Sequence, residues 1–552
     1  MQEKLTELVE EVIKRLYSVS IEVELTRPEE QFGDYATNVA MKLAKETGKN
    51  PREVAEETAK NLKSELVASA TVAGPGFINI KLTDKALLKQ ATAEPVKNLK
   101  DQVVVTEYSD PNPFKVLHAG HLYTSVVGDS IANMLENAGA KVHRVNFGGD
   151  VGLHVGKTMW AILRELGGEE PEKLKNLPES ERSEFMAKAY VAGTAAYDED
   201  GDSKEEIRKL NKLIYDIVAK NEKSSKLAQI YWTCRKWSYD YFDQFYERIG
   251  TKFEKYYPES EVAELGLKKV RQQLKNGVFK ESDGAVVFEG EGHGLHTRVF
   301  INSEGLPTYE TKDVGLIFTK WQDFHFDKSV VITGNEQEQY MTVVLKAVEQ
   351  FAPELVKATS HLTHGIVKLQ GGVKMSSRKG NILRAVDVLD AAAEANQKLT
   401  SKDDELVVLG AVKYAFLKQR TGGDIIYDPK ESVSLEGNSG PYLQYAHARA
   451  RSILTKALSG GKEPKDLVDG ERSLAKKLGE FPEVIVRATA ELMPHYICTY
   501  LYELSQTFNR FYENSRVIGD QREDGRLWLV DRYADVLKSG LELLGITAPE
   551  SM

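Results

Sequence analysis

A strand–helix–strand pattern between residues 102 and 147 constrains the fold more than any other feature of the sequence. "QVVVTEY" (102–108) is apolar enough for a strand buried on both faces, and "AKVHRVNF" (140–147) has the composition of a second strand. Between them, apolar side chains recur at helical spacing over 121–138. The pattern predicts a parallel βαβ unit, and therefore an α/β fold, with His118 in the first crossover.

Two histidines stand in that crossover, where the helix is expected to begin. In "PNPFKVLHAGH" (111–121), His118 and His121 flank an Ala-Gly pair. Helix N-termini present unpaired N–H groups and favour negative charge. Capped or core histidines, and a metal pair, are the alternatives. No cysteine or carboxylate lies close enough in sequence to complete a zinc set, so a triphosphate fits the pair better.

A second cationic segment lies about 250 residues later. "GGVKMSSRKGNIL" (371–383) combines glycines with lysines, an arginine and hydroxyl side chains. Alone, it would be typical of a solvated basic turn. Together with the histidine pair it supplies the second half of an anion clamp, as nucleotidyl transfer requires, because that chemistry depends on positioning and charge neutralisation.

The rest of the 552-residue chain divides by pattern into three parts. Residues 1–98 predict a small α+β domain, with helices at 2–17, 34–48 and 52–66 and an extended segment at 70–82. Residues 103–400 predict the α/β domain, with a mostly helical insertion at about 155–275. Residues 403–552 predict an all-helical domain.

Composition limits the possible partners and the compartment. The net charge of −10 argues against gripping nucleic acid by bulk electrostatics, so a bound RNA would be recognised through local pockets and stacking. No apolar run approaches the roughly 20 residues of a membrane span. The two cysteines, Cys234 and Cys498, indicate a reducing cytosol.

These motifs together resemble the arginyl-tRNA synthetase family of class I aminoacyl-tRNA synthetases. "PNPFKVLHAGH" and "KMSSRKG" are similar to the HIGH and KMSKS signatures of class I enzymes. Five further segments are similar to the arginyl family in particular: "GPGFIN" (74–79), "NFGGDVG" (146–152), "LPTYETKDVG" (306–315), "EGNSGPYLQYAHARARSI" (436–453) and the terminal "LELLGITAPESM". The resemblance implies a Rossmann-type catalytic core with an insertion, an N-terminal domain that contacts the tRNA elbow, and a DALR-type anticodon-binding bundle. It implies ligation of L-arginine to tRNA-Arg in protein biosynthesis, with ATP as substrate and Mg²⁺ accompanying it, and amino-acid activation that needs tRNA. We expect a cytoplasmic monomer without a protein metal site, a DNA partner or a membrane partner.

The resemblance also assigns the ATP site. His118, Gly120 and His121 would bind ATP, with the histidines steadying the α-phosphate. Lys374 would contact the departing pyrophosphate, and Met375 and Ser376 would shape its loop. Ser377 stands where the second KMSKS lysine would fall; in this family a lysine just ahead of HIGH is thought to compensate, and Lys115 occupies that place.

Arginine recognition calls for carboxylates, because a guanidinium pairs with them in a planar, bidentate fashion. Tyr309 and Asp313 stand one helical turn apart, and a solvent-facing pair is the alternative. The resemblance places this pair in the arginine pocket. It adds Glu259 and Gln337, and Asn112 at the α-amino and carboxyl end; Tyr340 occupies a position where relatives often carry histidine.

For tRNA, one helix face carries Tyr442, Tyr445 and Arg449, a pattern that a core helix would also show. The resemblance instead matches them, with Tyr512 and Arg516, to the anticodon-binding surface, where aromatic and guanidinium planes stack on bases. It matches Phe77 and Asn79 to the contact with the tRNA D-loop, for which a buried hairpin aromatic is the alternative.

Three other functions compete with this interpretation. A small-acid ligase with the same HxGH chemistry would lack the helical C-terminal 150 residues. A non-catalytic RNA-binding relative would not need intact His118, His121, Lys374, Tyr309 and Asp313. A class I synthetase of another specificity would lack the Tyr309/Asp313 pair and "LQYAHARARS".

Overall fold

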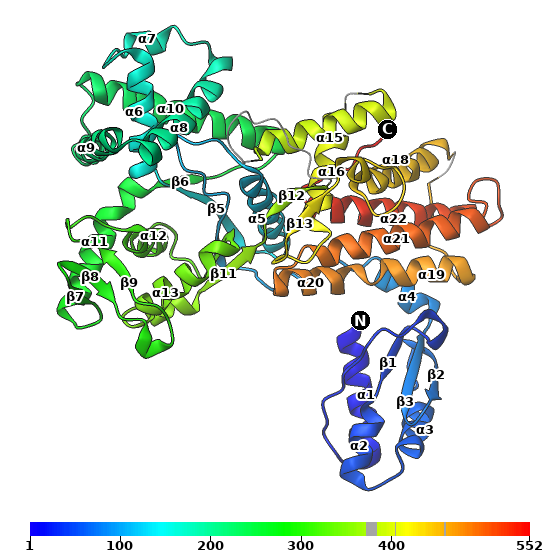
Figure 1. Ribbon diagram of the computed structural model, residues 1–552. Coiled ribbons are helices and arrows are strands. Elements are labelled where there is room, and N and C mark those ends of the chain that lie inside the picture. The colour runs from blue at the N-terminus through cyan, green and yellow to red at the C-terminus, as the bar shows by residue number, and fades with distance from the viewer. Residues whose placement is uncertain (371–382, 403, 458–459) are drawn as a thin grey trace.

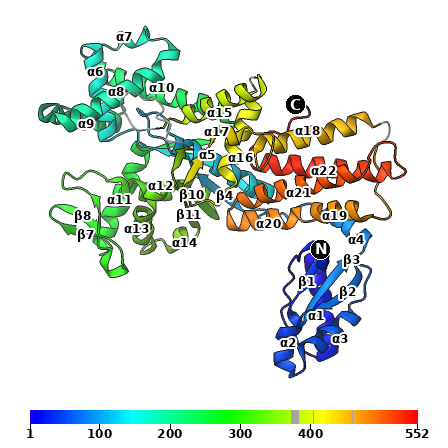
Figure 2. The ribbon, with the colours of Figure 1, turned by 45° about the vertical axis from the view of Figure 1, so that its right-hand side comes forward.

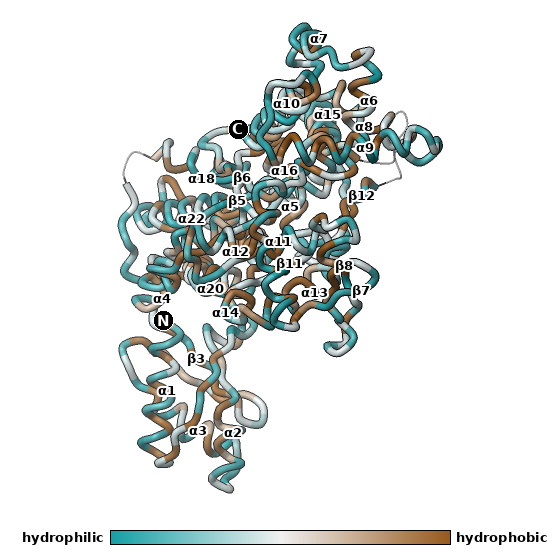
Figure 3. Tube along the Cα trace, turned by 90° about the vertical axis from the view of Figure 1, so that its left-hand side faces the viewer, coloured by the Kyte–Doolittle hydropathy of each residue, from teal (hydrophilic) through white to brown (hydrophobic). Residues whose placement is uncertain are grey.

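The computed structural model describes residues 1–370, 383–402, 404–457 and 460–552. The molecule is elongated, with an α/β region at one end and a helical bundle at the other (Figure 1). A small N-terminal domain projects from the bundle, and α4 (Asp84–Ala91) joins it to the rest (Figures 1, 2 and 3).

A five-stranded parallel sheet forms the centre of the α/β region, in the order β11-β10-β4-β5-β6. The predicted βαβ unit is present as β4, α5 and β5. Strand order reverses at β4, since β5 pairs on one side of it and β10 on the other; ligands of open α/β sheets bind at such a switch point, beyond the carboxyl ends of the strands. The elements are β4 (Val103–Glu107), α5 (Ala119–Asn137), β5 (Lys141–Gly148), β6 (Lys255–Pro258), β10 (Lys328–Gly334) and β11 (Thr359–His364).

Between β5 and β6 the chain makes a helical insertion with its own apolar core. Its helices are α6 (Leu153–Leu166), α7 (Glu172–Lys175), α8 (Glu179–Glu199), α9 (Gly201–Ala219) and α10 (Lys226–Ile249). The predicted helical stretch of 155–275 therefore contains an unpredicted strand, β6, which returns the chain to the sheet. A four-residue strand next to long helices gives too short a pattern to recognise.

The face of the parallel sheet that is turned away from α5 packs against a second apolar core. Helices and a three-stranded antiparallel sheet, in the order β7-β8-β9, build this core. These elements are α11 (Glu259–Lys275), β7 (Lys280–Ser282), β8 (Ala285–Phe288), β9 (Arg298–Ile301), α12 (Tyr309–Phe324), α13 (Glu338–Glu349) and α14 (Pro353–Lys357). Short 3₁₀ segments lie at Glu291–His293 and Asn335–Gln337.

The N-terminal domain is α+β, with an antiparallel sheet in the order β1-β3-β2. Its elements are α1 (Gln2–Tyr17), a 3₁₀ segment (Glu30–Phe32), β1 (Tyr35–Thr37), α2 (Val39–Thr47), α3 (Pro51–Asn61), β2 (Val67–Ala73), β3 (Phe77–Leu82) and α4 (Asp84–Ala91). The predicted helix at 34–48 was wrong at its start, because the first residues pair with β3 as β1. The segment at 70–82 is a hairpin rather than one extended run.

Charged side chains fasten this domain to the bundle. Arg472 of α19 (Asp469–Leu478) donates to Asp34 Oδ2 at 2.7 Å, to Asp84 Oδ1 at 2.6 Å and to the Leu82 carbonyl at 2.9 Å. Both carboxylates belong to the N-terminal domain, so one arginine joins two of its elements to the bundle.

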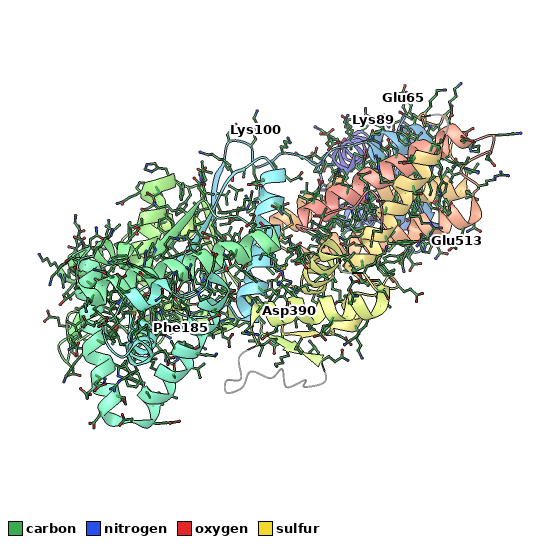
Figure 4. The ribbon with its side chains drawn as sticks, turned by 90° about the horizontal axis from the view of Figure 1, so that it is seen from above. Glu65, Lys89, Lys100, Phe185, Asp390 and Glu513 are labelled. Atoms are coloured by element: carbon green, nitrogen blue, oxygen red, sulfur yellow. The ribbon has the colours of Figure 1, made fainter. Side chains whose placement is uncertain are left out.

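The C-terminal region is helical, apart from β13, which pairs in parallel with β12. Its elements are β12 (Val367–Leu369), α15 (Ala385–Thr400), α16 (Glu405–Leu417), β13 (Ile425–Tyr427), α17 (Pro429–Ser432), α18 (Gly440–Lys456), α19 (Asp469–Leu478), α20 (Phe481–Glu491), α21 (His495–Asn514) and α22 (Glu523–Leu543). Seen from above, Phe185 of the insertion and Glu513 of α21 lie in opposite halves, with Asp390 of α15 between them (Figure 4). Within the described ranges, no helix is both long and apolar enough to cross a bilayer.

Helix α5 belongs to both regions. Its apolar side chains share one continuous core with α15, α16 and α18–α22. Ser130 of α5 also donates to the carbonyl of Leu543, at the end of α22, at 3.0 Å. The helix that begins at the histidine pair is therefore held by the bundle as well as by the sheet.

Candidate active site

The two histidines of the first crossover form the N-terminus of α5. His118 is the N-cap residue, and its Nδ1 accepts the Gly120 N–H at 3.1 Å. Nδ1 of His121 accepts the His118 N–H at 3.0 Å, and the rings stack with centroids 3.7 Å apart. A neutral imidazole whose Nδ1 accepts carries its proton on Nε2. Each ring thus keeps an N–H donor for a ligand.

Gly120 is required by this arrangement. A Cβ atom there would lie 2.9 Å from Nδ1 and Cε1 of His118, closer than side-chain carbons come. Any larger residue would push the His118 ring away and break its hydrogen bond to the backbone.

Lys115 gives this turn its positive charge. Burial lowers the pKa of His121, and His118 and Lys115 lower it further; the pKa of His118 is lowered by burial and by Lys115, against the opposing effect of Glu336. Neutral imidazoles beside a lysine favour an anionic ligand. The ammonium of Lys115 also lies 5.4 Å from the ring centroid of Tyr190, in the insertion.

Lys374, Met375 and Ser376 lie outside the described residues. The chain that follows them is attached to the histidine turn: Ala119 N–H donates to Leu383 O at 2.8 Å, and Ala385 N–H donates to Leu117 O at 2.9 Å. The chain that precedes them is attached too, because His364 Nε2 lies 2.5 Å from Thr124 Oγ1 on α5. Both flanking segments therefore meet the first turns of α5.

A cavity of about 830 Å³ opens at the carboxyl ends of the strands, beside the histidines. Eight of the residues predicted for ATP or arginine line it, from four separate stretches of chain. They are Asn112, His118, Gly120, His121, Glu259, Tyr309, Asp313 and Gln337.

One wall of the cavity carries Asp313 of α12, whose side chain is buried. The hydroxyl of Tyr340 donates a hydrogen bond to Asp313 Oδ2. Burial raises the pKa of Asp313 well above its usual range, and the nearby carboxylates of Glu107 and Glu259 raise it further. A guanidinium would remove this penalty by pairing with the carboxylate. The solvent-facing alternative is excluded for Asp313.

Glu259 begins α11 and is equally buried, but it already has a cation. Lys312 of α12 forms an ion pair with it, and both side chains are 4% exposed. Asp150 fixes the start of α11 by accepting the Ser260 N–H at 3.0 Å. The ammonium of Lys312 also lies 5.1 Å from the ring centroid of Tyr309, whose side chain is exposed at the cavity mouth.

Asn112 and Gln337 also line the cavity. Asn112 Oδ1 accepts the Gly149 N–H at 2.7 Å, which leaves its NH₂ group facing ligand space. A Cβ on Gly149 would lie 2.8 Å from that oxygen and 3.0 Å from Glu259 Oε1. The glycine thus lets Asn112 and Glu259 approach each other.

The predicted anticodon residues gather on α18 and α21. The Arg449 guanidinium lies 4.6 Å from the ring centroid of Tyr512, and Tyr442 OH accepts Asn509 Nδ2 at 2.9 Å. Tyr445 is 46% exposed. Arg516 follows α21 and is also exposed. Tyr445, Arg449 and Arg516 are therefore exposed, whereas Tyr442 and Tyr512 are half-buried and pack against the core of the bundle.

The two residues of the N-terminal domain that were predicted to contact RNA differ in their exposure to solvent. Phe77 begins β3 and is 42% exposed, which excludes the buried hairpin aromatic. Asn79 lies in the middle of β3 and is buried, so its side chain does not face solvent as Phe77 does.

Sequence reasoning missed several cavity residues, among them Asp110, Tyr340 as a partner of Asp313, and His364. Asp110 and His364 stand at or just beyond the carboxyl ends of β4 and β11. That position was the available signal, because ligands bind there. His361 and His364 point to opposite faces of β11: His361 Nε2 lies 2.8 Å from Thr333 Oγ1, whereas His364 faces α5.

Three features occur together in this molecule: a parallel sheet whose first crossover ends in a histidine-capped helix, a carboxylate-lined cavity at the switch point of that sheet, and a helical bundle packed on the same helix. Together they define a class I aminoacyl-tRNA synthetase. Comparisons with known proteins agree along the whole chain. Family models match the arginyl-tRNA synthetase N-terminal domain at 3–82, the class I (R) tRNA synthetase catalytic domain at 83–428 and the DALR anticodon-binding domain at 443–552. The chain therefore belongs to the arginyl-tRNA synthetase family.

Individual relatives give the same result. An arginine–tRNA ligase of Bacteroides fragilis is 30% identical over the full length of both chains. The arginyl-tRNA synthetase of Thermus thermophilus superimposes with a TM-score of 0.80 at 25% identity, again over all of both chains. The Plasmodium falciparum arginyl-tRNA synthetase shares the fold, with a TM-score of 0.76 at 21% identity over 100% of this chain and 99% of that one. The predicted fold class and the predicted arginine–tRNA ligase function are confirmed.

Proposed function

We propose that the cavity performs arginine activation with the following division of roles. ATP lies against the N-terminus of α5, where Nε2–H of His118 and of His121 donates to the α-phosphate as charge builds there. The carboxylate of L-arginine attacks that phosphorus, pyrophosphate leaves, and arginyl-adenylate forms. A terminal ribose hydroxyl of tRNA-Arg then takes the arginyl group and releases AMP. The donors left free by the two backbone-bound imidazoles carry this proposal.

Asp313 and Glu259 receive the guanidinium, and Tyr309 covers it at the cavity mouth. Asn112 and Gln337 hold the α-amino and carboxyl end. The position of Asn112 on the same segment as the histidines, and of Asp313 on α12, supports this orientation.

Lys115 neutralises phosphate charge next to the histidines, and Lys374, with Met375 and Ser376, contacts the leaving pyrophosphate. Mg²⁺ would enter with the triphosphate and neutralise its oxygens. Within the described ranges no three His, Cys, Asp or Glu side chains are grouped to hold a metal. The ion would accordingly be held mainly by the nucleotide itself.

The tRNA is bound by two domains. Tyr442, Tyr445, Arg449, Tyr512 and Arg516 of the DALR-type domain, residues 403–552, stack on or pair with anticodon bases. The N-terminal domain, residues 1–98, meets the tRNA elbow through the exposed Phe77, while the buried Asn79 supports β3 from within. The catalytic domain spans 103–400. We propose a cytoplasmic monomer that binds neither DNA nor membranes.

Pyrophosphate exchange tests the proposal. We expect ATP–pyrophosphate exchange only when L-arginine and tRNA-Arg are both present. Asp313→Asn should nearly abolish exchange and leave tRNA binding in a filter assay unchanged. Exchange with another amino acid, or an Asp313→Asn enzyme with unchanged arginine kinetics, would overturn the assignment.

A further inference from the structure

The segment that carries Lys115 is fastened to the helical insertion. Phe114, the residue just before it, is fully buried and belongs to the apolar core of the insertion. Its ring stacks on that of Tyr231 in α10, with centroids 5.5 Å apart. Its N–H donates to Ser238 Oγ at 3.0 Å, and its carbonyl accepts from Thr158 Oγ1 at 3.3 Å. The insertion therefore fixes the backbone just ahead of the histidine turn.

Lys115 follows a strained backbone position and leans on the insertion. Phe114 has a left-handed conformation, with φ of 68°, which residues other than glycine rarely adopt. The ammonium of Lys115 lies 5.4 Å from the ring centroid of Tyr190 in α8. Among the described residues, no carboxylate lies within 4 Å of this ammonium. The face of the Tyr190 ring, which carries partial negative charge, is therefore the contact that holds it.

This contact lies beside the proposed ATP site. Burial lowers the pKa of His118 and of His121, and the charge of Lys115 lowers each further, so the ammonium acts on the histidine turn. Lys115 is half-buried but is not among the described residues that line the cavity, so its ammonium stands at the cavity's edge. A lysine stem is flexible, and an ammonium without a restraining contact occupies many positions. A fixed charge at this edge therefore depends on Tyr190.

We infer that Tyr190 is a positioning residue for Lys115, whose ammonium it holds beside the histidines. This inference rests on the function proposed above, in which Lys115 neutralises phosphate charge. No described residue bonds to the Tyr190 hydroxyl, so the face of the ring carries the effect. Through this ring the insertion sets where one cation of the ATP site stands.

ATP–pyrophosphate exchange by the full-length enzyme, with saturating L-arginine and tRNA-Arg, measures this role. Tyr190→Leu should lower kcat/KM for ATP about fivefold, the effect of losing a cation–π contact at a half-buried site, and leave the KM for L-arginine unchanged. Tyr190→Phe keeps the ring and should match wild type. Tyr197→Leu is the matched control and should also match wild type, because Tyr197 is another half-buried ring of α8 and the cation over it is Lys157, at 4.4 Å.

Two further measurements separate positioning from packing. Fluorinated phenylalanines at position 190 keep the shape of the ring while withdrawing charge from its face, so kcat/KM for ATP should fall with each added fluorine. Tyr190→Leu combined with Lys115→Met should be no slower than Lys115→Met alone, because the ring acts through the ammonium.

The outcomes also separate this inference from the role proposed for Lys115. Exchange that is independent of fluorination, or additive losses in the double variant, would overturn the positioning role and leave that of Lys115 standing. So would a Tyr190→Leu enzyme that works as well as wild type or better. Wild-type exchange by Lys115→Met would overturn both roles.

Discussion

The hydroxyl of Tyr340 donates a hydrogen bond to the buried carboxylate of Asp313, 27 residues earlier in the chain. Tyr340 lies on α13 and Asp313 on α12, so the bond fixes the carboxylate from across the cavity wall. Arg298 lies 5.4 Å from the Tyr340 ring centroid and pairs with Glu310, which holds the tyrosine in place. The tyrosine thus orients the group proposed to bind the guanidinium.

Tyr340→Phe should make arginine binding more sensitive to acid. The pKa of Asp313 is raised, and binding needs the ionised carboxylate, so affinity is full above that pKa and falls as pH drops through it. Loss of the hydroxyl removes a bond that favours the ionised form. The pKa then rises further, affinity falls about tenfold near neutrality, and the acid loss begins at higher pH.

Calorimetry of arginine binding between about pH 5.5 and 9 measures this shift. Tyr427→Phe removes a buried hydroxyl bonded to Ser432, away from the cavity, and serves as the control. Identical pH curves for wild type and Tyr340→Phe would contradict the orienting role.

Lys320→Met should strongly destabilise the catalytic domain. Lys320 and Glu107 form an ion pair whose side chains are only 1% and 3% exposed, so removing the cation leaves a buried, unpaired carboxylate. The expected loss is about 3–5 kcal/mol of unfolding free energy. Lys398→Met, in an exposed pair with Glu394, should cost less than about 0.5 kcal/mol. Denaturant unfolding monitors both variants, and equal losses would contradict the prediction.

His364→Phe should slow activation without unfolding the protein. The phenyl ring keeps the packing on Tyr123 but loses the contact with Thr124, which joins β11 to the first turns of α5. Thr124→Val breaks the same contact. Each should lower the exchange rate constant about tenfold, and the double variant should resemble either single one.

His361→Phe is the matched control, since His361 faces Thr333 on the other side of β11. Additive losses in the double variant would show that the two residues act separately.

Arg472→Met should release the N-terminal domain. The arginine donates to Asp34, Asp84 and the Leu82 carbonyl, and its loss leaves Asp34 buried without its closest cation. Limited proteolysis should then cleave between residues 92 and 102 and liberate a fragment of the domain's size, and tRNA affinity should fall. Arg487→Met, in an exposed pair with Glu491 on α20, should behave like wild type. Cleavage at wild-type rates in Arg472→Met would show that other contacts suffice.

Much of the site could be predicted because its key elements are encoded locally. The change from buried-strand to helical periodicity locates the start of α5, so the amino-acid sequence alone places His118 and His121 at a helix N-terminus. Tyr309 and Asp313 are one turn apart on one helix, and the structure buries the aspartate in the cavity.

What was missed depends on contacts between distant segments. The partner of Asp313 is Tyr340, and that of His364 is Thr124, 240 residues away; no local pattern encodes either pair. β1 and β6 were missed because three or four residues give no period, and their strand geometry comes from pairing with β3 and β5. Asp110 bonds to the Phe147 N–H of the neighbouring strand, 37 residues away, and no local pattern encodes that contact either.

Helix α5 and the C-terminal bundle share one apolar core, so the catalytic domain and the bundle depend on each other to fold. A truncation before α22 would uncover Ile131, Met134 and Leu135 and remove the carbonyl that receives Ser130. The truncated protein would then expose apolar side chains of α5 and would be prone to aggregate. His118 caps the other end of the same helix. A redesign of the C-terminal domain must therefore keep the end of α22, because Leu543 there accepts the hydrogen bond from Ser130 of α5.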